Sequence, residues 1–372
     1  MKLIAAMILG FLMDLVFGDP HGLIHPVQII GWFIDRIKRG MQRMLYGCSF
    51  DEVKEKNIPR KETGELVCGY VLTFVIVTGT FLVVYGILYA AGRVHPWLRF
   101  GLETFFIYQI LATKSLETES MKVYDRLKAG DLLGARREIS YLVGRDTQEL
   151  NESEIARADV ETIAENTADG VVAPLFFIAI GGAPLGFAYK AVNTLDSMVA
   201  YRNEELIHIG HASAKLDDLC GFIPARLAAA AMMMAAAILG LDFKGAVRIF
   251  RRDRYNHLSP NSAQTEAVAA GALNIQLGGT HTYFGKVVEK PTIGDDIRPV
   301  EYQDIKRTNQ LLYVSAVLTL IICCGISWLV YGLPVLLGFQ QPLRSFGGAG
   351  KLMSDCGPGN HRHFPVNHVV KN

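Results

Sequence analysis

Two long apolar runs limit this chain more than any other feature of its sequence. From Leu66 to Gly92 there are 27 residues without a charge, and a second uncharged run extends from Thr308 to Leu343. An α-helix rises about 1.5 Å per residue, so about 20 apolar residues cross a bilayer core of about 30 Å. Both runs therefore predict membrane-spanning helices, the second over residues 311–339, and we expect an integral membrane protein.

The composition agrees and excludes several classes of protein. Apolar residues make up 50% of the 372 residues, charged residues make up 20%, and mean hydropathy is +0.24. The 37 Lys and Arg nearly balance the 36 Asp and Glu, so we expect neither a nucleic-acid partner nor a disordered chain. The six cysteines have no Cys-x-x-Cys pair and no His at metal-ligand spacing. A zinc site or a disulfide framework is therefore not expected.

Three further segments are expected to belong to the membrane domain. Residues 3–17 are interpreted as a retained first helix, because no cleavage site typical of a signal peptide follows them. Residues 219–241 are apolar apart from Arg226, and their Ala- and Met-rich half favours close helix packing. Residues 170–189 are uncharged but interrupted by prolines and glycines, so a continuous helix is not expected there. Broken backbone at membrane depth requires surrounding protein or a wet cavity.

These segments predict a mainly α, polytopic integral membrane protein with four to five transmembrane helices, one broken or re-entrant segment and soluble helical blocks. The polar blocks are residues 114–169 and 242–307, and Asn151 or Ser153 is expected to cap a helix in the first of them. Residues 1–343 are expected to form one membrane-embedded domain, followed by a flexible tail at 344–372. Lys and Arg are similarly frequent on both sides of the first long apolar run, so the positive-inside rule does not fix the orientation.

Candidate chemistry begins with an acidic helix face just before the interrupted segment. Glu161, Glu165 and Asp169 are spaced by four residues, and Asn166 lies next to Glu165. Like charges at this spacing repel one another weakly, so solvent or a bound cation should compensate. One interpretation is a solvated acidic face. The other is a Mg²⁺ site formed by these three carboxylates, which substrate phosphates often complete.

More polar side chains follow the interrupted segment. Lys190, Asn193, Asp196 and Ser197 come first, and the last three share a helix face. Ionisable groups beside membrane segments are functional-site hypotheses by default. The charged residues that come next and are candidates for the same site are Arg202, Asp217, Asp218 and Arg226. We expect at least two of these acids to share a site with Glu161 or Glu165.

The N-terminal region contains a Gly18-Asp19-Pro20 turn and then His25. Such a turn usually only ends a helix. His25 can carry a proton near neutral pH or can be a hydrogen-bonded structural residue. The sequence has no P-loop, no dinucleotide-binding glycine motif, no nucleophile elbow and no His-Glu-x-x-His motif. Familiar nucleotide-binding, hydrolase and zinc-protease folds are therefore not expected.

Taken together and in order, these motifs resemble the signature of the adenosylcobinamide-phosphate synthases, the CbiB/CobD family of cobalamin biosynthesis. The resemblance extends from about Met1 to Leu343, and the tail and Ala200, where a glycine is expected, depart from the family pattern. The segments that carry it are Gly18-Asp19-Pro20, His25-Pro26-Val27, Glu161-x-x-Ala164-Glu165-Asn166-x-x-Asp169-Gly170, Tyr189-Lys190-x-x-Asn193-Thr194-x-Asp196-Ser197, Asp217-Asp218 with Pro224-Ala225-Arg226, Ser259-Pro260-Asn261, Ala270-Gly271-Ala272-Leu273 and Leu277-Gly278-Gly279.

The resemblance implies a multi-pass ligase of the cytoplasmic membrane that uses ATP and Mg²⁺. Its members join adenosylcobyric acid, as substrate, to (R)-1-amino-2-propanol O-phosphate or to ethanolamine phosphate, and give adenosylcobinamide phosphate. Membrane lipid and other membrane enzymes of cobalamin assembly are the further partners that it implies. The interrupted segment would line the floor of a cleft wide enough for the corrinoid.

Two functions from other classes are alternatives to the ligase. One is a corrinoid or small-molecule transporter, because broken membrane helices flanked by acids resemble transporter sites. The other is a non-catalytic scaffold of a biosynthetic complex.

The residues that match the motifs receive candidate roles in the ligase. The candidates are Glu161, Glu165, Asp196, Asp217 and Asp218 for catalysis, Asp19, His25, Asn166, Lys190, Asn193, Ser197, Arg202, Arg226 and Asn261 for binding substrate or phosphate, and Glu161, Glu165 and Asp169 for Mg²⁺.

Overall fold

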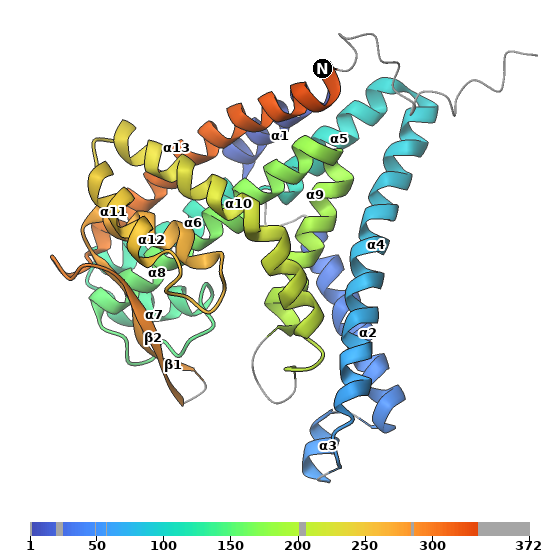
Figure 1. Ribbon diagram of the computed structural model, residues 1–372, viewed down its shortest axis with the longest axis horizontal. Helices are drawn as coiled ribbons and strands as arrows, with labels where there is room; N and C mark the ends of the chain where they lie inside the picture. The colour runs from blue at the N-terminus through green and yellow to red at the C-terminus, as the bar shows by residue number, and fades with distance from the viewer. Residues whose placement is uncertain are drawn as a thin grey trace, which may run out of the picture.

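The computed structural model describes residues 2–19, 25–48, 50–56, 58–200, 206–283 and 286–333. Within these ranges the protein is mainly helical, with one two-stranded antiparallel sheet (Figure 1). Arg202 and the tail predicted from residue 344 lie outside the described residues. The helices are α1 (Lys2–Phe17), α2 (Pro26–Tyr46), α3 (Phe50–Glu55), α4 (Glu62–Val94), α5 (Pro96–Ile110), α6 (Thr113–Lys128), α7 (Leu132–Ser140), α8 (Glu152–Asn166), α9 (Ala173–Val199), α10 (His211–Ile238), α11 (Phe243–Asp253), α12 (Ser262–Leu273) and α13 (Tyr302–Ser327), with π-helical turns η1 (Thr167–Val172) and η2 (Trp328–Gly332).

Four helical stretches of the described chain are long and apolar enough to cross a bilayer, which confirms a polytopic membrane fold. They are α4, the run Glu152–Val199, α10 and the run Tyr302–Gly332. The most apolar part of Glu152–Val199 is 72% buried, whereas the corresponding part of α4 is only 28% buried. The run Glu152–Val199 therefore forms the centre of the bundle. Helix α4 lies along one edge of the molecule with α2 beside it (Figure 1).

The segment predicted to be interrupted is helical on both sides of a single break. Gly181 and Gly182 have non-helical backbone angles, and Gly182 has a φ of +67°. A Cβ at Gly182 would lie 2.7 Å from an oxygen of Glu103, so glycine is required by both conformation and space. The expectation of a break is therefore right at this pair. Pro174 does not break the helix, and the backbone oxygen of Gly170, four residues earlier, accepts a hydrogen bond from Ala112 N instead.

The predicted cap and the predicted close packing are both present. Asn151 Oδ1 accepts a hydrogen bond from Glu154 N at 3.0 Å, and Glu154 Oε2 accepts one from Asn151 N at 2.8 Å. These two bonds satisfy N–H groups that the first turn of α8 leaves unpaired. In α10, small side chains such as Ala229 and Ala235 pack against Ala269 of α12 in one buried cluster.

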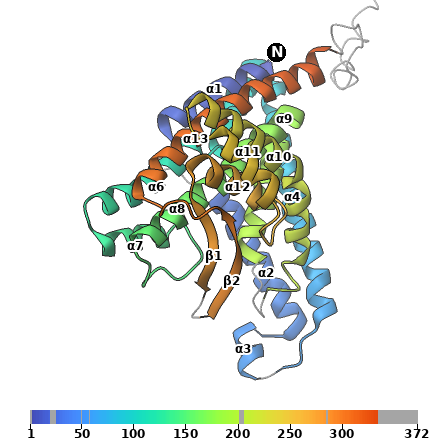
Figure 2. The same cartoon turned by 60° about the vertical axis from the view of Figure 1, so that its left-hand side comes forward.

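The sheet is the element that the sequence prediction missed. Strands β1 (Gln276–Tyr283) and β2 (Lys286–Gly294) pair antiparallel, and the register shifts between Gly278 and Thr280. Internal glycines and Pro291 weaken the alternation by which strands are usually recognised. The hairpin extends from the group of helices that contains α7, α8 and α12 (Figure 2).

Candidate functional site

Acidic side chains converge where α8, η1, α9 and α10 meet. Asp169 of η1 interacts electrostatically with Glu165 of α8 and Asp196 of α9. Asp217 of α10 interacts with all three, and with Asp218. The π-helical turn and the packing of α10 against η1 and α9 bring these residues together. We call these five residues the acid cluster, and it unites both sides of the interrupted segment.

Lys190 provides a positive charge beside the acid cluster. Its ammonium group interacts electrostatically with Asp169 and with Asp19 from the N-terminal turn. Asp19 Oδ1 lies 3.7 Å from His25 Nε2, and His25 Nδ1 accepts a hydrogen bond from Val27 N at 3.2 Å. His25 is therefore the N-cap of α2, and the motif near the N-terminus reaches the same site as Lys190.

The loop before α12 closes another side of the acid cluster. Ser262 Oγ donates a hydrogen bond to Glu165 Oε1 at 2.7 Å, and Ser259 Oγ donates one to Asp218 Oδ1 at 3.0 Å. Asn261 Nδ2 donates to the backbone oxygen of Asp218 at 2.9 Å. These three bonds fix two carboxylates of the cluster and tie the loop to α10.

Four other predicted binding residues take part in hydrogen bonds within the protein in this structure. Asn166 Nδ2 donates to the backbone oxygen of Thr162 at 2.9 Å. Ser197 Oγ donates to the backbone oxygen of Asn193, also at 2.9 Å, one turn earlier on α9. Arg226 donates to Asn261 Oδ1 at 3.4 Å. Their predicted contacts with substrate stay predictions.

Glu161 differs from the other predicted acids because the protein itself uses both of its oxygens. Oε1 accepts a hydrogen bond from Gly278 N at 2.7 Å, and Oε2 forms an ion pair with Arg145. Gly278 has a φ of +72°, and a Cβ there would lie 2.5 Å from the backbone oxygen of Pro291. The glycine therefore permits the approach of hairpin to helix, and Glu161 joins β1 to α8. Its predicted roles in catalysis and metal binding stay predictions.

The sequence prediction missed two titratable residues beside this site. Glu266 of α12 is buried and interacts with Glu165 and Glu161, and burial raises the pKa of Glu266 well above its ordinary value of 4.5. Burial also lowers the pKa of His257 below 6.5, although Glu165 opposes this shift. A single acid in the Ala-rich helix Ser262–Leu273 was a signal for Glu266. Nothing in the sequence pattern indicated His257.

The donor set fits a magnesium ion bound together with phosphates. Within the described ranges, no three His, Cys, Asp or Glu side chains are placed to hold a metal ion by themselves. Mg²⁺ is usually held by one or two carboxylates, with substrate phosphates and water as the remaining ligands. The acid cluster offers only hard oxygen donors, and Asp217 Oδ1 is buried with no hydrogen-bond partner in the described structure. The acid cluster therefore suits a Mg²⁺ ion that one or two carboxylates hold together with substrate phosphates.

A cavity of about 580 Å³ opens between the segment before α8 and strand β1. Arg145, Arg157, Glu154, Thr280 and Thr282 are among the residues that line it. Because Arg145 is the ion-pair partner of Glu161, the cavity lies one side chain away from the α8 face that carries the acid cluster. Of its two guanidinium groups Arg145 is paired with Glu161, and Arg157 can pair with phosphate oxygens, although the carboxylates of Asp146, Glu149 and Glu154 also line the cavity.

Fold and site together define a polytopic helical membrane protein with a half-buried carboxylate cluster where its central helices meet. The family model described as CobD/Cbib protein matches residues 7–312. The chain therefore belongs to the CobD/CbiB family and has a role in cobalamin biosynthesis.

Similar proteins match more than four-fifths of the chain. The chain is 45% identical over 321 residues to the cobalamin biosynthesis protein CobD of Clostridium perfringens, covering 85% of this chain and 97% of that protein. It is 47% identical over 309 residues to CobD of Geobacter metallireducens, covering 83% and 92%. It is 43% identical over 328 residues to cobalamin biosynthesis protein CbiB of Salmonella typhimurium, covering 87% and 98%. No solved structure matches the chain.

Proposed function

We propose that this protein is an adenosylcobinamide-phosphate synthase of the cell membrane, an ATP-dependent ligase that joins a carboxylic acid to an amine. The proposed substrates are adenosylcobyric acid and (R)-1-amino-2-propanol O-phosphate, or ethanolamine phosphate. Membership of the CobD/CbiB family supports the pathway. The observation that carries the proposed reaction is the acid cluster with Lys190 beside Asp169.

The proposed reaction explains why such a cluster is needed. A carboxylate reacts with an amine only after one of its oxygens becomes a leaving group, and transfer of a phosphoryl group from ATP provides that group. Mg²⁺, when bound, neutralises the charge of the polyphosphate. We expect one or two of Asp169, Asp196 and Asp217 to hold the ion, with phosphate oxygens and water as its other ligands. Lys190 lies where it can pair with a phosphate oxygen beside them.

The second half of the proposed reaction needs a proton acceptor. The amine nitrogen bonds to the activated carbonyl carbon, the bond from that carbon to the phosphate oxygen breaks, and phosphate leaves. The nitrogen then has a surplus proton, which a nearby carboxylate can accept. Glu165 is our candidate, because Ser262 orients its side chain through a hydrogen bond of 2.7 Å.

The cavity beside Arg145 supports a polyphosphate site close to the acid cluster. Arg157 offers a planar guanidinium group suited to a bidentate phosphate contact, with the guanidinium group of Arg145 beside it. The Arg145–Glu161 ion pair holds one of these groups in place. On this proposal Glu161 is a positioning residue, and the loop that follows α7 brings the nucleotide to α8.

One assay tests the proposal against its alternatives. Protein purified in detergent is supplied with ATP, Mg²⁺, adenosylcobyric acid and aminopropanol phosphate, and the corrinoid products are separated by mass. We expect an amide product, with ADP and phosphate released in equal amounts. Uptake of corrinoid into vesicles without any product would instead indicate a transporter. Neither product nor uptake would leave a scaffold role.

A further inference from the structure

The exposed side of helix α2 changes character along its length. Its inner face is buried, where Ile30 and Ile34 pack with Leu72 of α4 and Leu195 of α9. The first half of the outer face exposes apolar side chains, with Trp32 59% accessible and Phe33 47% accessible. The second half exposes Arg36, Arg39 and Arg43, with Gly40 between them. An apolar and aromatic turn followed by basic turns is typical of a helix that leaves the lipid at that point.

The neighbouring helix α4 changes from polar to apolar at about the level where the exposed side of α2 does. The end of α2 lies beside the start of α4, because Leu45 approaches Gly64 closely. The apolar part of α4 begins at Leu66, and Tyr70 is 54% accessible one turn later. Aromatic residues of this kind concentrate at the level of the lipid head groups. The arginines of α2 therefore lie close to the level at which the apolar part of α4 begins.

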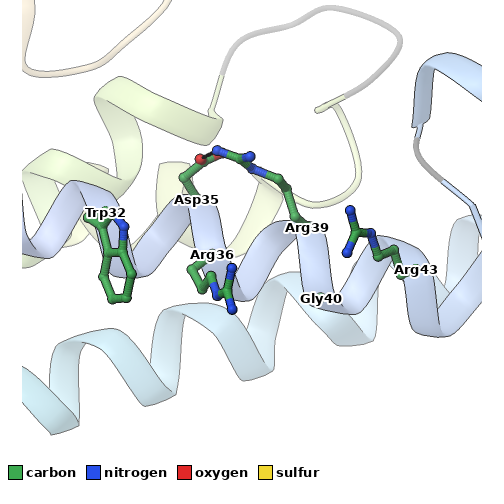
Figure 3. A pocket seen from close by; sticks show the side chains of 6 residues that line it. All are labelled: Trp32, Asp35, Arg36, Arg39, Gly40 and Arg43. Carbon is green, nitrogen blue, oxygen red and sulfur yellow. Dashed lines mark hydrogen bonds and ion pairs between the residues drawn. The ribbon is translucent and has the colours of Figure 1, made fainter.

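These arginines surround a hollow on the surface of α2. Its volume is about 320 Å³, and it is lined by Trp32, Asp35, Arg36, Arg39, Gly40 and Arg43 (Figure 3). A Cβ at Gly40 would meet no atom within 4 Å, so the missing side chain leaves the hollow open. Arg36 and Arg43 project from the helix on either side of Gly40 (Figure 3).

The charges around the hollow favour an anion. Asp35 forms an ion pair with Arg39, which accounts for one arginine. Among the described residues, neither Arg36 nor Arg43 forms a salt bridge. Two exposed guanidinium groups therefore flank the hollow without a compensating carboxylate, and planar guanidinium groups match the geometry of phosphate.

We propose that this hollow binds the phosphate of an acidic phospholipid head group. Arg36 and Arg43 pair with the phosphate oxygens, and Trp32 lies against the glycerol and upper acyl region. The apolar turn with Trp32 and Phe33 favours a lipid over a free phosphate ion, because a soluble anion gains nothing from exposed aromatic rings. This site is independent of the proposed ligase reaction, since none of its residues belongs to the acid cluster.

Fluorescence quenching by brominated lipid tests the proposal on the full-length protein. The chain has three tryptophans, so replacing Trp97 and Trp328 by Phe leaves Trp32 as the reporter. We expect brominated phosphatidylglycerol to reach half-maximal quenching at about tenfold lower concentration than brominated phosphatidylcholine, because each basic residue near the surface attracts anionic lipid. The double variant Arg36→Gln/Arg43→Gln should lose this preference.

Two matched variants separate the site from general charge and folding effects. Lys128→Gln/Arg137→Gln removes the same charge from exposed positions of α6 and α7 and should keep the preference. Gly40→Leu fills the hollow without a clash and improves helix propensity, so it should remove the preference while circular dichroism shows full helicity.

Equal quenching by the two lipids in the parent protein, or an unchanged preference in Arg36→Gln/Arg43→Gln, would overturn the proposal. So would inorganic phosphate that removes the preference at concentrations matching those of the lipid, which would identify a site for free phosphate.

Discussion

Two carboxylates of the acid cluster, Glu165 and Asp196, are the side chains on which the proposed reaction depends most. We expect Glu165→Gln and Asp196→Asn each to reduce ligation at least about 100-fold, because loss of a positioned acid or base typically costs that much. The amide oxygen of Gln can still accept the hydrogen bond from Ser262, so the fold should survive. Product formation per milligram of folded membrane protein measures the effect, with Ser262→Ala as a milder control. Near-normal turnover in either acid variant would remove that residue from the mechanism.

Substitution of Glu161 distinguishes a catalytic role of this residue from a structural one. Its partner Arg145 is largely buried, with 9% of the side chain accessible, and removing one member of such a pair costs about 3 kcal/mol. We therefore expect Glu161→Gln to lower the melting temperature in detergent, since Arg145 loses its counter-charge while Gly278 N keeps an acceptor. Turnover of the protein that remains folded should fall much less than in Glu165→Gln. An unchanged melting temperature with abolished turnover would restore the catalytic role predicted from the sequence.

Glu266 should make stability depend on pH. Burial raises the pKa of Glu266 above its ordinary value of 4.5, so the folded state binds this proton more tightly than the unfolded state does. As pH rises above 4.5 the unfolded chain releases the proton first, and stability falls until the pH passes the pKa of the folded state. Melting curves in detergent at a series of pH values measure this fall. Glu266→Gln, which stays neutral, should lose this part of the dependence, and equal curves for both proteins would contradict the assignment.

The limits of sequence reasoning are clearest at single residues. Glu165, Asp169 and Asp196 stand out from the sequence because acids flank an uncharged stretch that a membrane should cover. Glu161 belongs to the same periodic face, but its partners Arg145 and Gly278 come from a loop and a hairpin. No spacing rule predicts such long-range contacts, because they depend on how separate elements pack. For the same reason the sequence did not indicate His257, because its interaction with Glu165 depends on how distant segments pack.

At the scale of elements, the crossing of α11 and α12 depends on two glycines. A Cβ at Gly271 would lie 2.4 Å from the backbone oxygen of Gly245, and backbone cannot yield as a side chain can. Gly271→Ala should therefore destabilise the protein by about 1–3 kcal/mol. Gly86→Ala in α4, where a Cβ would meet nothing within 4 Å, should be neutral or stabilising. Thermal unfolding of the pair in the same detergent measures the difference, and equal melting temperatures would argue against a close crossing.

Elements with a strong local signal were predictable, and those defined by their neighbours were not. The apolar length of α4 and a cap of α8 at Asn151 or Ser153 follow from the sequence alone, because propensity and hydropathy act locally, and the structure selects Asn151. The break at Gly181–Gly182 was predicted, but its position within the segment depends on how closely Glu103 approaches. The hairpin of β1 and β2 has little strand pattern of its own and is held by α8 and α12.

At the scale of the whole molecule, α4 determines how the rest lies relative to the membrane. Its 33 residues make a helix of about 50 Å, longer than the bilayer core of about 30 Å. The two ends of α4 must therefore lie on opposite sides. Figure 1 places α7 and the hairpin toward the α3 end of α4, and the junction with α5 at the opposite end. ATP is cytosolic, so the proposed reaction requires the α3 end to face the cytoplasm.

Cysteine labelling tests this orientation with two equally exposed positions. Leu133 in α7 and Val94 at the end of α4 are each 76% accessible, so a difference in labelling reports sidedness and not exposure. In a background with the six native cysteines replaced, a membrane-impermeant maleimide added to intact cells should label Val94→Cys. Leu133→Cys should react only after the membrane is permeabilised. Labelling of Leu133→Cys in intact cells would place the cavity beside Arg145 outside the cell, where ATP could not supply the proposed ligation.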